Sequence, residues 1–436
     1  MLKYLELSNI GPTSAMSLEL GSRLNLITGD NGLGKSFLLD VAWWALTRRW
    51  PQEVNSKLSS GYTAQPTNRR KPATIRFTVE SKTRDISYTS EYVARDQAWK
   101  GRAGRPYNPG LVIYAHADGS FSVWDPARNY WKKSGNVDVQ ERLPAYVFSP
   151  KEVWDGLEME VAGLDTTVCN GLLRDWASWI RENGIAAENM RVVLEMLSPS
   201  GQSGDQLKPG PLTRISLNDA RDIPSLQTGY ADAVPILHTS SGIRRIVALA
   251  YMLLWCWQEH NWASKQIGDQ PARQVILLID ELESHLHPRW QRTILRSLLK
   301  LSGVMHQQAA IQLICATHSP LILASAEPIF NEKTDAWFDL DLSTATRKPR
   351  VELKKRVFER RGDVSNWLTS EAFDLREPRS LEAEEALISA AELLHSGDVS
   401  DAEISAVDKR LHAVLSDVDP FWLRWTQYRT SLQERK

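Results

Sequence analysis

Eight residues near the N-terminus have the types and spacing of a loop that binds nucleotide phosphates. The stretch Gly29-Asp30-Asn31-Gly32-Leu33-Gly34-Lys35-Ser36 fits the pattern G-x-x-x-x-G-K-[ST]. In such a loop the backbone N–H groups surround the phosphates, the lysine contacts the β- and γ-phosphates, and the final hydroxyl binds Mg²⁺. We therefore expect residues 29–36, together with Phe37, to bind a nucleotide. The alternative is an ordinary glycine-rich turn ahead of a helix.

The elements predicted on either side place this loop where the chemistry requires it. Residues 23–28 (RLNLIT) predict a strand, and residues 36–47 (SFLLDVAWWALT) have the apolar periodicity of a helix. A loop between a strand and a helix directs its N–H groups, and the positive end of the helix dipole, toward the phosphates. This placement favours the nucleotide site over the simple turn.

A second apolar run ends in two carboxylates. Residues 274–280 (QVILLID) predict a strand buried on both faces, and Glu281 follows Asp280 directly. An aspartate at a strand end can hold Mg²⁺ through water, and the next carboxylate can polarise the water that attacks the γ-phosphate. We expect Asp280 to be a metal ligand and Glu281 to be catalytic. The alternative is a strand that happens to end in an acidic turn.

A histidine follows a third apolar run. Residues 311–316 (IQLICA) predict a strand, and Thr317-His318-Ser319-Pro320 comes directly after it. A histidine in this position could contact the γ-phosphate. Because a single histidine at a strand end is usually a solvated turn residue, its order after the other two motifs is what supports a catalytic role for His318.

Four motifs, in this order, resemble ABC-class ATPases of the SMC, RecF and OLD type. They are the phosphate loop and the segments 238–245 (HTSSGIRR), 277–288 (LLIDELESHLHP) and 316–320 (ATHSP). The resemblance implies ATP and Mg²⁺ as cofactors, ATP hydrolysis as the reaction, and catalytic roles for Lys35, Glu281 and His318. It also implies an α/β fold, namely an ABC-ATPase-type P-loop NTPase with a mixed central sheet, an antiparallel β-lobe, a helical insertion and a small, mainly helical C-terminal region.

The same resemblance implies assembly of two or more copies. Ser240, Ser241 and Gly242 would belong to the family's signature motif, which binds the γ-phosphate of ATP held by a neighbouring protomer. Two head-to-tail protomers would then enclose two nucleotides. Thr239 and Ile243 depart from the common LSGGQ form, as in RecF and OLD proteins. The residues alone also fit a plain helix N-cap, because residues 246–257 predict an apolar helix.

The chain divides into four predicted regions. These are a first ATPase lobe with the phosphate loop (1–150), a helical insertion with a polar loop (151–211), a second lobe (212–345) and a helical C-terminal region (346–436). The equivalent of the family's Q-loop is placed at residues 146–149. Within these regions we predict strands at 73–80, 86–93, 111–115, 121–124, 212–217 and 337–342, and helices at 290–301, 381–395 and 401–415.

Composition excludes several classes of protein. The 436 residues are 42% hydrophobic and 24% charged, with a net charge of -1, as in an ordinary globular protein. The longest apolar stretch is too short to span a bilayer and the N-terminus has no signal-peptide pattern, so we expect a cytoplasmic protein without a membrane partner. Cys169, Cys256 and Cys315 have no disulfide or zinc spacing and are expected to be buried thiols. The 17 tryptophans are expected mainly in the core.

A basic, aromatic segment leaves two interpretations open. Between Arg95 and Lys133, seven basic residues stand against three acidic ones and alternate with six tyrosines and tryptophans. Basic side chains among aromatic rings could bind DNA by contacting phosphates and stacking on bases. Aromatic residues are also common in strands, so the segment could instead be a structural β-lobe, with residues 111–115 and 121–124 forming a hairpin that turns at Asp118 and Gly119.

Two acidic or histidine-containing clusters could bind a metal. Asp339 and Asp341 form a D-x-D, which OLD-type proteins use in a C-terminal nuclease, although alternating acids on an edge strand are more often solvated. Glu283, His285 and His287 have the spacing E-x-H-x-H. In the family this position corresponds to the D-loop, which contacts the opposite protomer, and we favour that interface role.

These observations predict an ATPase whose nucleotide state switches a dimer and acts on DNA or on a protein effector. Residues 151–158 (KEVWDGLE) and 169–176 (CNGLLRDW) are similar to stand-alone ATPases of bacterial anti-phage systems such as Septu, in which a separate nuclease or toxin acts in trans. One alternative is a RecF-like DNA repair ATPase. Another is a scaffold that binds ATP with little turnover.

Overall fold

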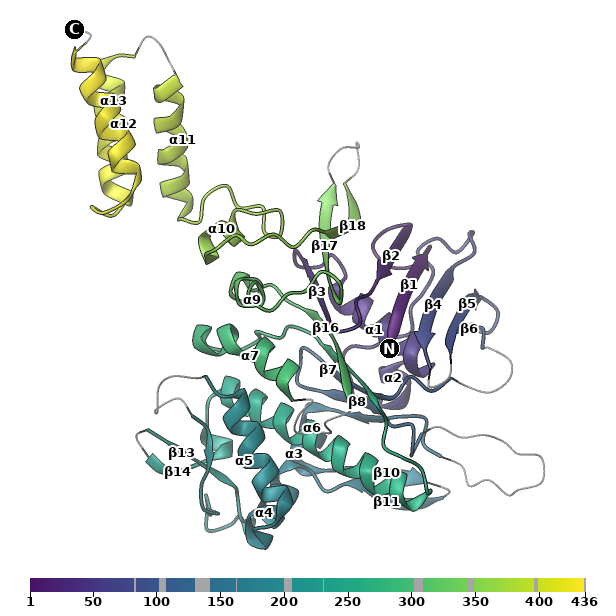
Figure 1. Cartoon of the computed structure of the whole chain (residues 1–436). Helices are drawn as coiled ribbons and strands as arrows, with labels where there is room; N and C mark the ends of the chain where they lie inside the picture. The colour runs from purple at the N-terminus through teal and green to yellow at the C-terminus, as the bar shows by residue number, and fades with distance from the viewer. Residues whose placement is uncertain are drawn as a thin grey trace. The chain divides into compact units, whose positions relative to one another are not determined.

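The computed structural model describes residues 1–81, 84–101, 107–129, 142–161, 163–199, 206–229, 231–301, 309–343, 349–395 and 399–434. The chain forms two compact units, Met1–Gly362 and Asp363–Lys436 (Figure 1). All the motifs of the predicted nucleotide site lie in the first unit.

An eight-stranded mixed sheet forms the centre of the first unit, with the order β18-β17-β3-β16-β15-β7-β8-β9. The five strands from β17 to β7 run parallel to one another, whereas β18, β8 and β9 are antiparallel to their neighbours. The carboxyl ends of β3, β15 and β16 therefore meet at one edge. The strands are β3 (Leu24–Gly29), β7 (Leu111–Ala115), β8 (Phe121–Trp124), β9 (Tyr146–Phe148), β15 (Gln274–Ile279), β16 (Ala310–Ala316), β17 (Asp335–Ser343) and β18 (Arg350–Arg356).

A five-stranded antiparallel sheet, with the order β2-β1-β4-β5-β6, forms the predicted β-lobe. Helix α1 (Lys35–Thr47) contacts strands of both sheets, including β1, β4, β3 and β16. Its Trp43 and Trp44 are buried, as expected for a helix that is apolar around most of its circumference. The strands are β1 (Leu2–Ser8), β2 (Ala15–Glu19), β4 (Thr74–Glu80), β5 (Asp85–Val93) and β6 (Ala98–Trp99), and the short helix α2 is Pro51–Val54.

Helix α6, which has 26 residues, packs against α3, α4, α5 and β7. Helix α5 packs against α6 and α7, and α7 packs against α9. The helices are α3 (Pro150–Asp155), α4 (Leu172–Glu182), α5 (Ile185–Leu197), α6 (Ser241–Gln266), α7 (Pro288–Lys300) and α9 (Pro320–Ala326), with the 3-10 helix η1 (Ile236–His238). The additional strands are β10 (Leu157–Val161), β11 (Leu164–Cys169), β12 (Lys208–Pro209), β13 (Ser225–Thr228) and β14 (Ala231–Pro235).

Two predicted elements of this region are wrong. The helical insertion expected over 151–211 is interrupted by the β10–β11 hairpin, because Gly156 ends α3 at φ +111° and Gly163 forms the hairpin turn at φ +79°. The strand expected at 212–217 is an irregular segment with one bridge, Thr213 to Ile223, and Leu217 is fully exposed.

In the basic, aromatic segment, the aromatic residues that the structure describes are buried, whereas Arg95 and Lys100 are exposed. Strands β7 and β8 form the predicted hairpin, but they lie inside the large sheet. The rings of Trp99, Tyr107, Tyr114 and Trp124 are each at most 9% exposed, so base stacking by these residues is wrong and the structural interpretation is confirmed for them. Arg102, Arg105 and residues 130–133 lie outside the described residues.

The D-x-D residues take part in ion pairs of the large sheet. Strand β17 lies between β3 and β18, so the expected edge position is wrong. Asp339 is 1% exposed and accepts hydrogen bonds from Thr28 Oγ1 (2.8 Å) and Arg356 Nη2 (3.0 Å), while Asp341 pairs with Lys354 (3.4 Å). These partners argue against a nuclease metal pair. Strand β18 also corrects the prediction that the region from 346 onward is helical.

The second unit is helical, with α10 (Val364–Leu368), α11 (Leu381–His395), α12 (Asp401–Val414) and α13 (Phe421–Glu434). Helices α11 and α12 confirm the prediction to within one residue, whereas α13 was not predicted. All three cysteines are buried thiols, as expected. In the part of the chain that the structure describes, no helix is both long and apolar enough to cross a membrane.

Candidate active site

The phosphate loop begins at the end of β3 and ends at the first residue of α1. Gly29, Gly32 and Gly34 have φ values of +133°, +80° and +103°, a region of backbone conformation that strongly favours glycine. Space is most limiting at the first of them, while a Cβ on Gly34 would lie 3.0 Å from Pro12 Cγ. A Cβ on Gly29 would overlap the carbonyl oxygen of Leu340 in β17, whereas a Cβ on Gly32 would meet open space. Strand β17 therefore determines how the loop leaves the sheet.

Lys35 lies along this loop. Its Nζ donates hydrogen bonds to the carbonyl oxygens of Gly29 (2.7 Å) and Asp30 (2.9 Å). Burial lowers the pKa of Lys35, while the carboxylates of Asp280 and Asp30 raise it. Gly34 is the N-cap of α1 and supplies no side-chain cap, so the first N–H groups of the helix remain without a side-chain acceptor. This arrangement suits a bound anion.

Asp280 and Ser36 form a pair of oxygen donors beside the loop. Asp280 directly follows β15 and is 4% exposed, and its Oδ1 is buried with no hydrogen-bond partner. Burial raises the pKa of Asp280, whereas interaction with the Ser36 hydroxyl lowers it. A buried carboxylate oxygen without a donor is costly unless a cation neutralises it, and hard oxygen ligands are those that Mg²⁺ prefers. The two residues therefore fit Mg²⁺.

Glu281 is held in a left-handed backbone conformation (φ +49°) by an arginine from α6. The Arg245 guanidinium donates hydrogen bonds to the carbonyl oxygens of Asp280 (2.9 Å), Glu281 (3.2 Å) and Ala117 (2.6 Å). Left-handed backbone costs a non-glycine residue about 1 to 3 kcal/mol and persists only when neighbouring groups enforce it. Arg245 thus connects the signature helix to the strand end that carries both acids. Arg245 belongs to the segment 238–245 that resembles the signature motif, but the sequence alone assigns no role to its side chain.

Glu283 connects the ends of β15 and β16. Its carboxylate accepts hydrogen bonds from the Thr317 hydroxyl (2.7 Å) and from the backbone N–H of His318. Burial and the Lys35 charge lower the pKa of His318, so its imidazole is neutral at neutral pH. Ser319 Oγ caps α9 by accepting from the Ile322 N–H (3.3 Å). The structure therefore places His318 at the same sheet edge as the phosphate loop and Asp280.

The E-x-H-x-H cluster is used for local structure. Glu283 makes the hydrogen bonds above, and His287 caps α7 through Nδ1, which accepts from the Arg289 N–H (3.3 Å). No group of three potential metal ligands is found among the described His, Cys, Asp and Glu residues. His285 contributes its backbone, against which Gly242 packs so closely that a Cβ on Gly242 would overlap the His285 carbonyl oxygen.

The signature residues begin α6 as predicted. Ser240 is the N-cap, its Oγ accepts from the Ile243 N–H (3.4 Å), and Ser241 and Gly242 form the first turn. The N-cap interpretation is therefore confirmed, and binding of a neighbour's γ-phosphate stays a prediction.

The Q-loop assignment at 146–149 stays a prediction. Residues Tyr146–Phe148 form β9 at the far edge of the sheet, two strands away from the neighbour of β15. That neighbour is β7, where the Ala115 carbonyl accepts from the Asp280 N–H (2.9 Å). His116, the next residue, is 2% exposed and its Nε2 hydrogen-bonds the Ser122 hydroxyl (2.8 Å). The residues after β7 therefore lie beside the acidic strand end.

A carboxyl group on α1 was also missed. Asp40 accepts a hydrogen bond from the Tyr114 hydroxyl of β7 (3.1 Å). Burial raises the pKa of Asp40 to about 7. Its position one helical turn beyond Ser36 could have indicated a place near the phosphate loop. Only the fold shows that it faces Tyr114 of β7.

One family model matches most of the first unit. The family described as "AAA domain, putative AbiEii toxin, Type IV TA system" matches residues 24–324, a range that begins with β3 and ends within α9. The matched range contains the phosphate loop, Asp280, Glu281 and His318.

Two curated proteins are similar to this chain over very different lengths. Septu protein PtuA from Bacillus thuringiensis is 20% identical over 357 residues, which are 81% of this chain and 80% of PtuA. The Retron Vc95 probable ATPase from Vibrio cholerae serotype O1 biovar El Tor is 48% identical over 50 residues, which are 12% of this chain and only 9% of that protein.

Two of the solved structures with partial similarity are an SMC head domain and RecF. The SMC head domain from Thermotoga maritima is 15% identical with a TM-score of 0.38, and the match covers 82% of this chain and 99% of that one. The recombination mediator protein RecF is 13% identical with a TM-score of 0.38, covering 78% and 95%. At these scores the fold assignment depends on the strand order and the phosphate loop described above.

Proposed function

We propose that this chain, which belongs to the AAA-domain family matched by residues 24–324, binds and hydrolyses ATP with Mg²⁺ as a dimeric switch in bacterial anti-phage defence. The observation that carries the proposal is the geometry of one sheet edge. There the buried, unpartnered oxygen of Asp280 lies beside Ser36, and Lys35 and His318 follow neighbouring strands.

Each residue has a role that its position supports. Lys35 and the uncapped N–H groups of α1 would hold the β- and γ-phosphates. Ser36 and Asp280 would hold Mg²⁺, which neutralises phosphate charge when bound. Glu281 would orient and polarise the attacking water. The neutral His318 would donate a hydrogen bond to the γ-phosphate.

Dimerisation is the part of the proposal that supplies the signature residues. Gly242 packs against His285 of its own chain. At the N-terminus of α6, Ser240 and Ser241 are exposed and Gly242 is half-exposed. A helix N-terminus of this kind can bind the γ-phosphate of a second protomer's ATP. ATP would then join two copies, and hydrolysis would release them.

Replacement of the catalytic glutamate tests both turnover and dimerisation. Glu281→Gln should abolish hydrolysis and retain ATP, so that sedimentation shows an ATP-dependent dimer. Adding Lys35→Ala to the same variant removes the contacts to the phosphates. The double variant should then sediment in the presence of ATP as it does without nucleotide. An ATP-bound Glu281→Gln protein that stays monomeric would refute the switch.

The defence role is supported by the similarity to PtuA, which extends over 81% of this chain. We propose that an effector protein, a nuclease or a toxin, acts in trans on the nucleotide signal. Phage plaque counts on cells that carry the native gene cluster should rise when Lys35→Ala is introduced. A RecF-like repair protein would instead bind gapped DNA in preference to duplex, and a scaffold would keep its protective effect in the Glu281→Gln variant.

A further inference from the structure

Three helices of the second unit, α11, α12 and α13, pack around a core of their own. Trp425 of α13 is 1% exposed, and its Nε1 donates a hydrogen bond to Asp408 of α12 (2.8 Å). The Tyr428 hydroxyl donates to the Leu393 carbonyl of α11 (2.8 Å). These contacts determine which face of α13 points inward. The buried core residues are Ala383, Ala386, Leu387, Ala390, Val407, Leu411, Leu415 and Trp425.

On the opposite face of α13 the side chains that the structure describes are mostly uncharged, with Asp417 and Asp419 at its N-terminal end and Arg424 exposed next to Leu423. We call this surface the α13 face; it consists of Val418, Pro420, Leu423, Thr426, Gln427, Thr430 and Ser431. From Leu423 onward these residues follow the spacing i, i+3, i+4, i+7 and i+8, which places them on one side of a helix. Leu423 is 81% exposed and Val418 is 88% exposed.

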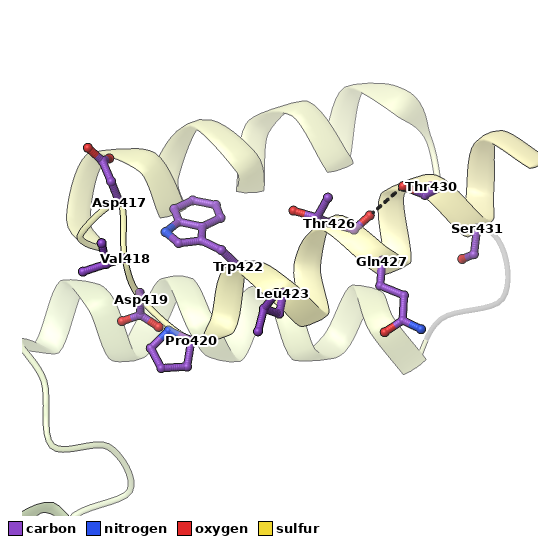
Figure 2. A pocket seen from close by; sticks show the side chains of 10 residues that line it. All are labelled: Asp417, Val418, Asp419, Pro420, Trp422, Leu423, Thr426, Gln427, Thr430 and Ser431. Atoms are coloured by element: carbon purple, nitrogen blue, oxygen red, sulfur yellow. Dashed lines mark hydrogen bonds between the residues drawn. The ribbon is translucent and has the colours of Figure 1, made fainter.

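A groove of about 730 Å³ runs along the α13 face, and Asp417, Asp419 and Trp422 line it as well (Figure 2). Figure 2 shows Leu423 and Gln427 projecting from the same side of α13. A solvent-facing helix surface normally carries charged residues, so an uncharged strip with two exposed aliphatic side chains favours a binding surface.

Charge indicates which kind of partner would fit. Residues 363–436 contain 15 Asp and Glu against 8 Lys and Arg, a net charge of −7, although the whole chain has a net charge of -1. A unit with this net charge repels nucleic acid phosphates and disfavours pairing with a second copy of itself. It attracts a basic partner. A helical strip with i, i+3, i+4 and i+7 contacts matches a second helix laid alongside it.

We infer that the α13 face binds a basic amphipathic helix of a partner protein. The inference deepens the proposed function, on which it rests, because an effector that acts in trans must attach to the ATPase. The apolar side of the partner helix contacts Leu423 and Val418, and its basic side faces the acidic surroundings.

The probe is a synthetic 21-residue peptide with leucine at helical a and d positions and lysine and alanine elsewhere. Binding of the labelled peptide to the full chain is measured by fluorescence anisotropy in 150 mM salt. Two matched peptides serve as controls, one with glutamate in place of lysine and one of identical composition in scrambled order. We expect the amphipathic basic peptide to bind at least about tenfold more tightly than either control. Equal binding of the scrambled peptide would overturn the inference.

A variant of the surface provides the second comparison. Leu423→Asp should weaken peptide binding at least about tenfold, as expected for a central apolar contact. Leu217→Asp, which changes a fully exposed leucine of the first unit, should leave binding unchanged. Circular dichroism checks the fold, and Leu423→Gln is the milder substitute if the aspartate variant unfolds. Unchanged binding by a folded Leu423 variant would overturn the inference.

Sedimentation and DNA binding test whether a second copy of the chain or DNA, rather than a partner helix, occupies the α13 face. If nucleotide-free wild type is a dimer that Leu423→Asp dissociates, a second copy occupies the α13 face and the inference is wrong. Competition of the peptide by a DNA duplex would also overturn it. ATP hydrolysis by the wild type is measured in parallel. Peptide discrimination without ATP turnover would refute the proposed function alone, whereas turnover without peptide binding would refute only this inference.

Discussion

Loss of the Arg245 guanidinium should slow ATP hydrolysis without weakening ATP binding. Arg245 donates three hydrogen bonds to backbone carbonyls, two of them on Asp280 and Glu281. A hydrogen bond from a charged donor contributes about 1.5 to 3 kcal/mol, and such contributions do not add fully. We therefore expect Arg245→Ala to cost about 3 kcal/mol in the arrangement that orients Glu281, which corresponds to about a hundredfold lower kcat.

Replacing Arg245 by lysine should have an intermediate effect on kcat. Arg245→Lys keeps the charge but cannot reach three carbonyls with the same planar fork, so its kcat should fall between those of wild type and Arg245→Ala. KM for ATP should stay within about threefold of wild type in both variants, because the phosphate loop is not altered.

Steady-state phosphate release at saturating Mg²⁺-ATP measures both constants. The matched control is Arg174→Ala, which removes an exposed arginine from α4. A folded Arg245→Ala protein whose kcat lies within threefold of wild type would show that Arg245 does not position Glu281. A large rise in KM with unchanged kcat would contradict the reasoning as well, since it would place the arginine in nucleotide binding.

Three further predictions concern the first unit. Gly29→Ala should abolish ATP binding in a calorimetric titration, because its Cβ overlaps β17, whereas Gly32→Ala, which meets open space, should weaken binding only about tenfold through backbone strain. Burial raises the pKa of Asp40 to about 7, so the folded state retains a proton that the unfolded chain releases near pH 4. Stability should therefore fall as the pH rises from about 4 to 7, and Asp40→Asn should remove that part of the fall in thermal unfolding; parallel pH curves for the two proteins would contradict this. Asp339→Asn should lower the unfolding temperature by weakening the ion pair with Arg356, and any Mg²⁺-dependent DNA nicking lost in this variant would revive the nuclease alternative.

Local sequence patterns predicted most of the candidate active site at the sheet edge. The apolar runs at β3, β15 and β16 are buried on both faces and therefore read as strands without reference to the rest of the chain. Glycine and lysine spacing identified the phosphate loop. Asp280 and His318 were predictable because each directly follows one of these strands.

Residues that act through distant partners were not predictable in the same way. Nothing near Glu283 in the sequence shows that its carboxylate accepts hydrogen bonds from Thr317 and His318, which follow β16. The carbonyl groups that accept hydrogen bonds from Arg245 of α6 are likewise evident only in the folded chain. The hairpin of β7 and β8 was predicted as a hairpin, but its place in the large sheet depends on pairing with β15, which lies far along the chain. The α13 helix was missed because its aromatic residues follow Pro420 closely and its outer face has no charge pattern.

The position of β3 between β16 and β17 has a consequence for synthesis of the protein. The strand that leads into the phosphate loop pairs with residues up to Leu340, so its second neighbour leaves the ribosome only after some three hundred more residues have been added. At typical elongation rates this interval lasts about 15 to 60 s. During that time Leu24, Leu26 and Ile27 of β3 lack one or both of the neighbouring strands β16 and β17. A nascent chain released early would therefore lack a correctly positioned phosphate loop. The sheet that positions the phosphate loop is thus completed late, after nearly the entire first unit has been translated.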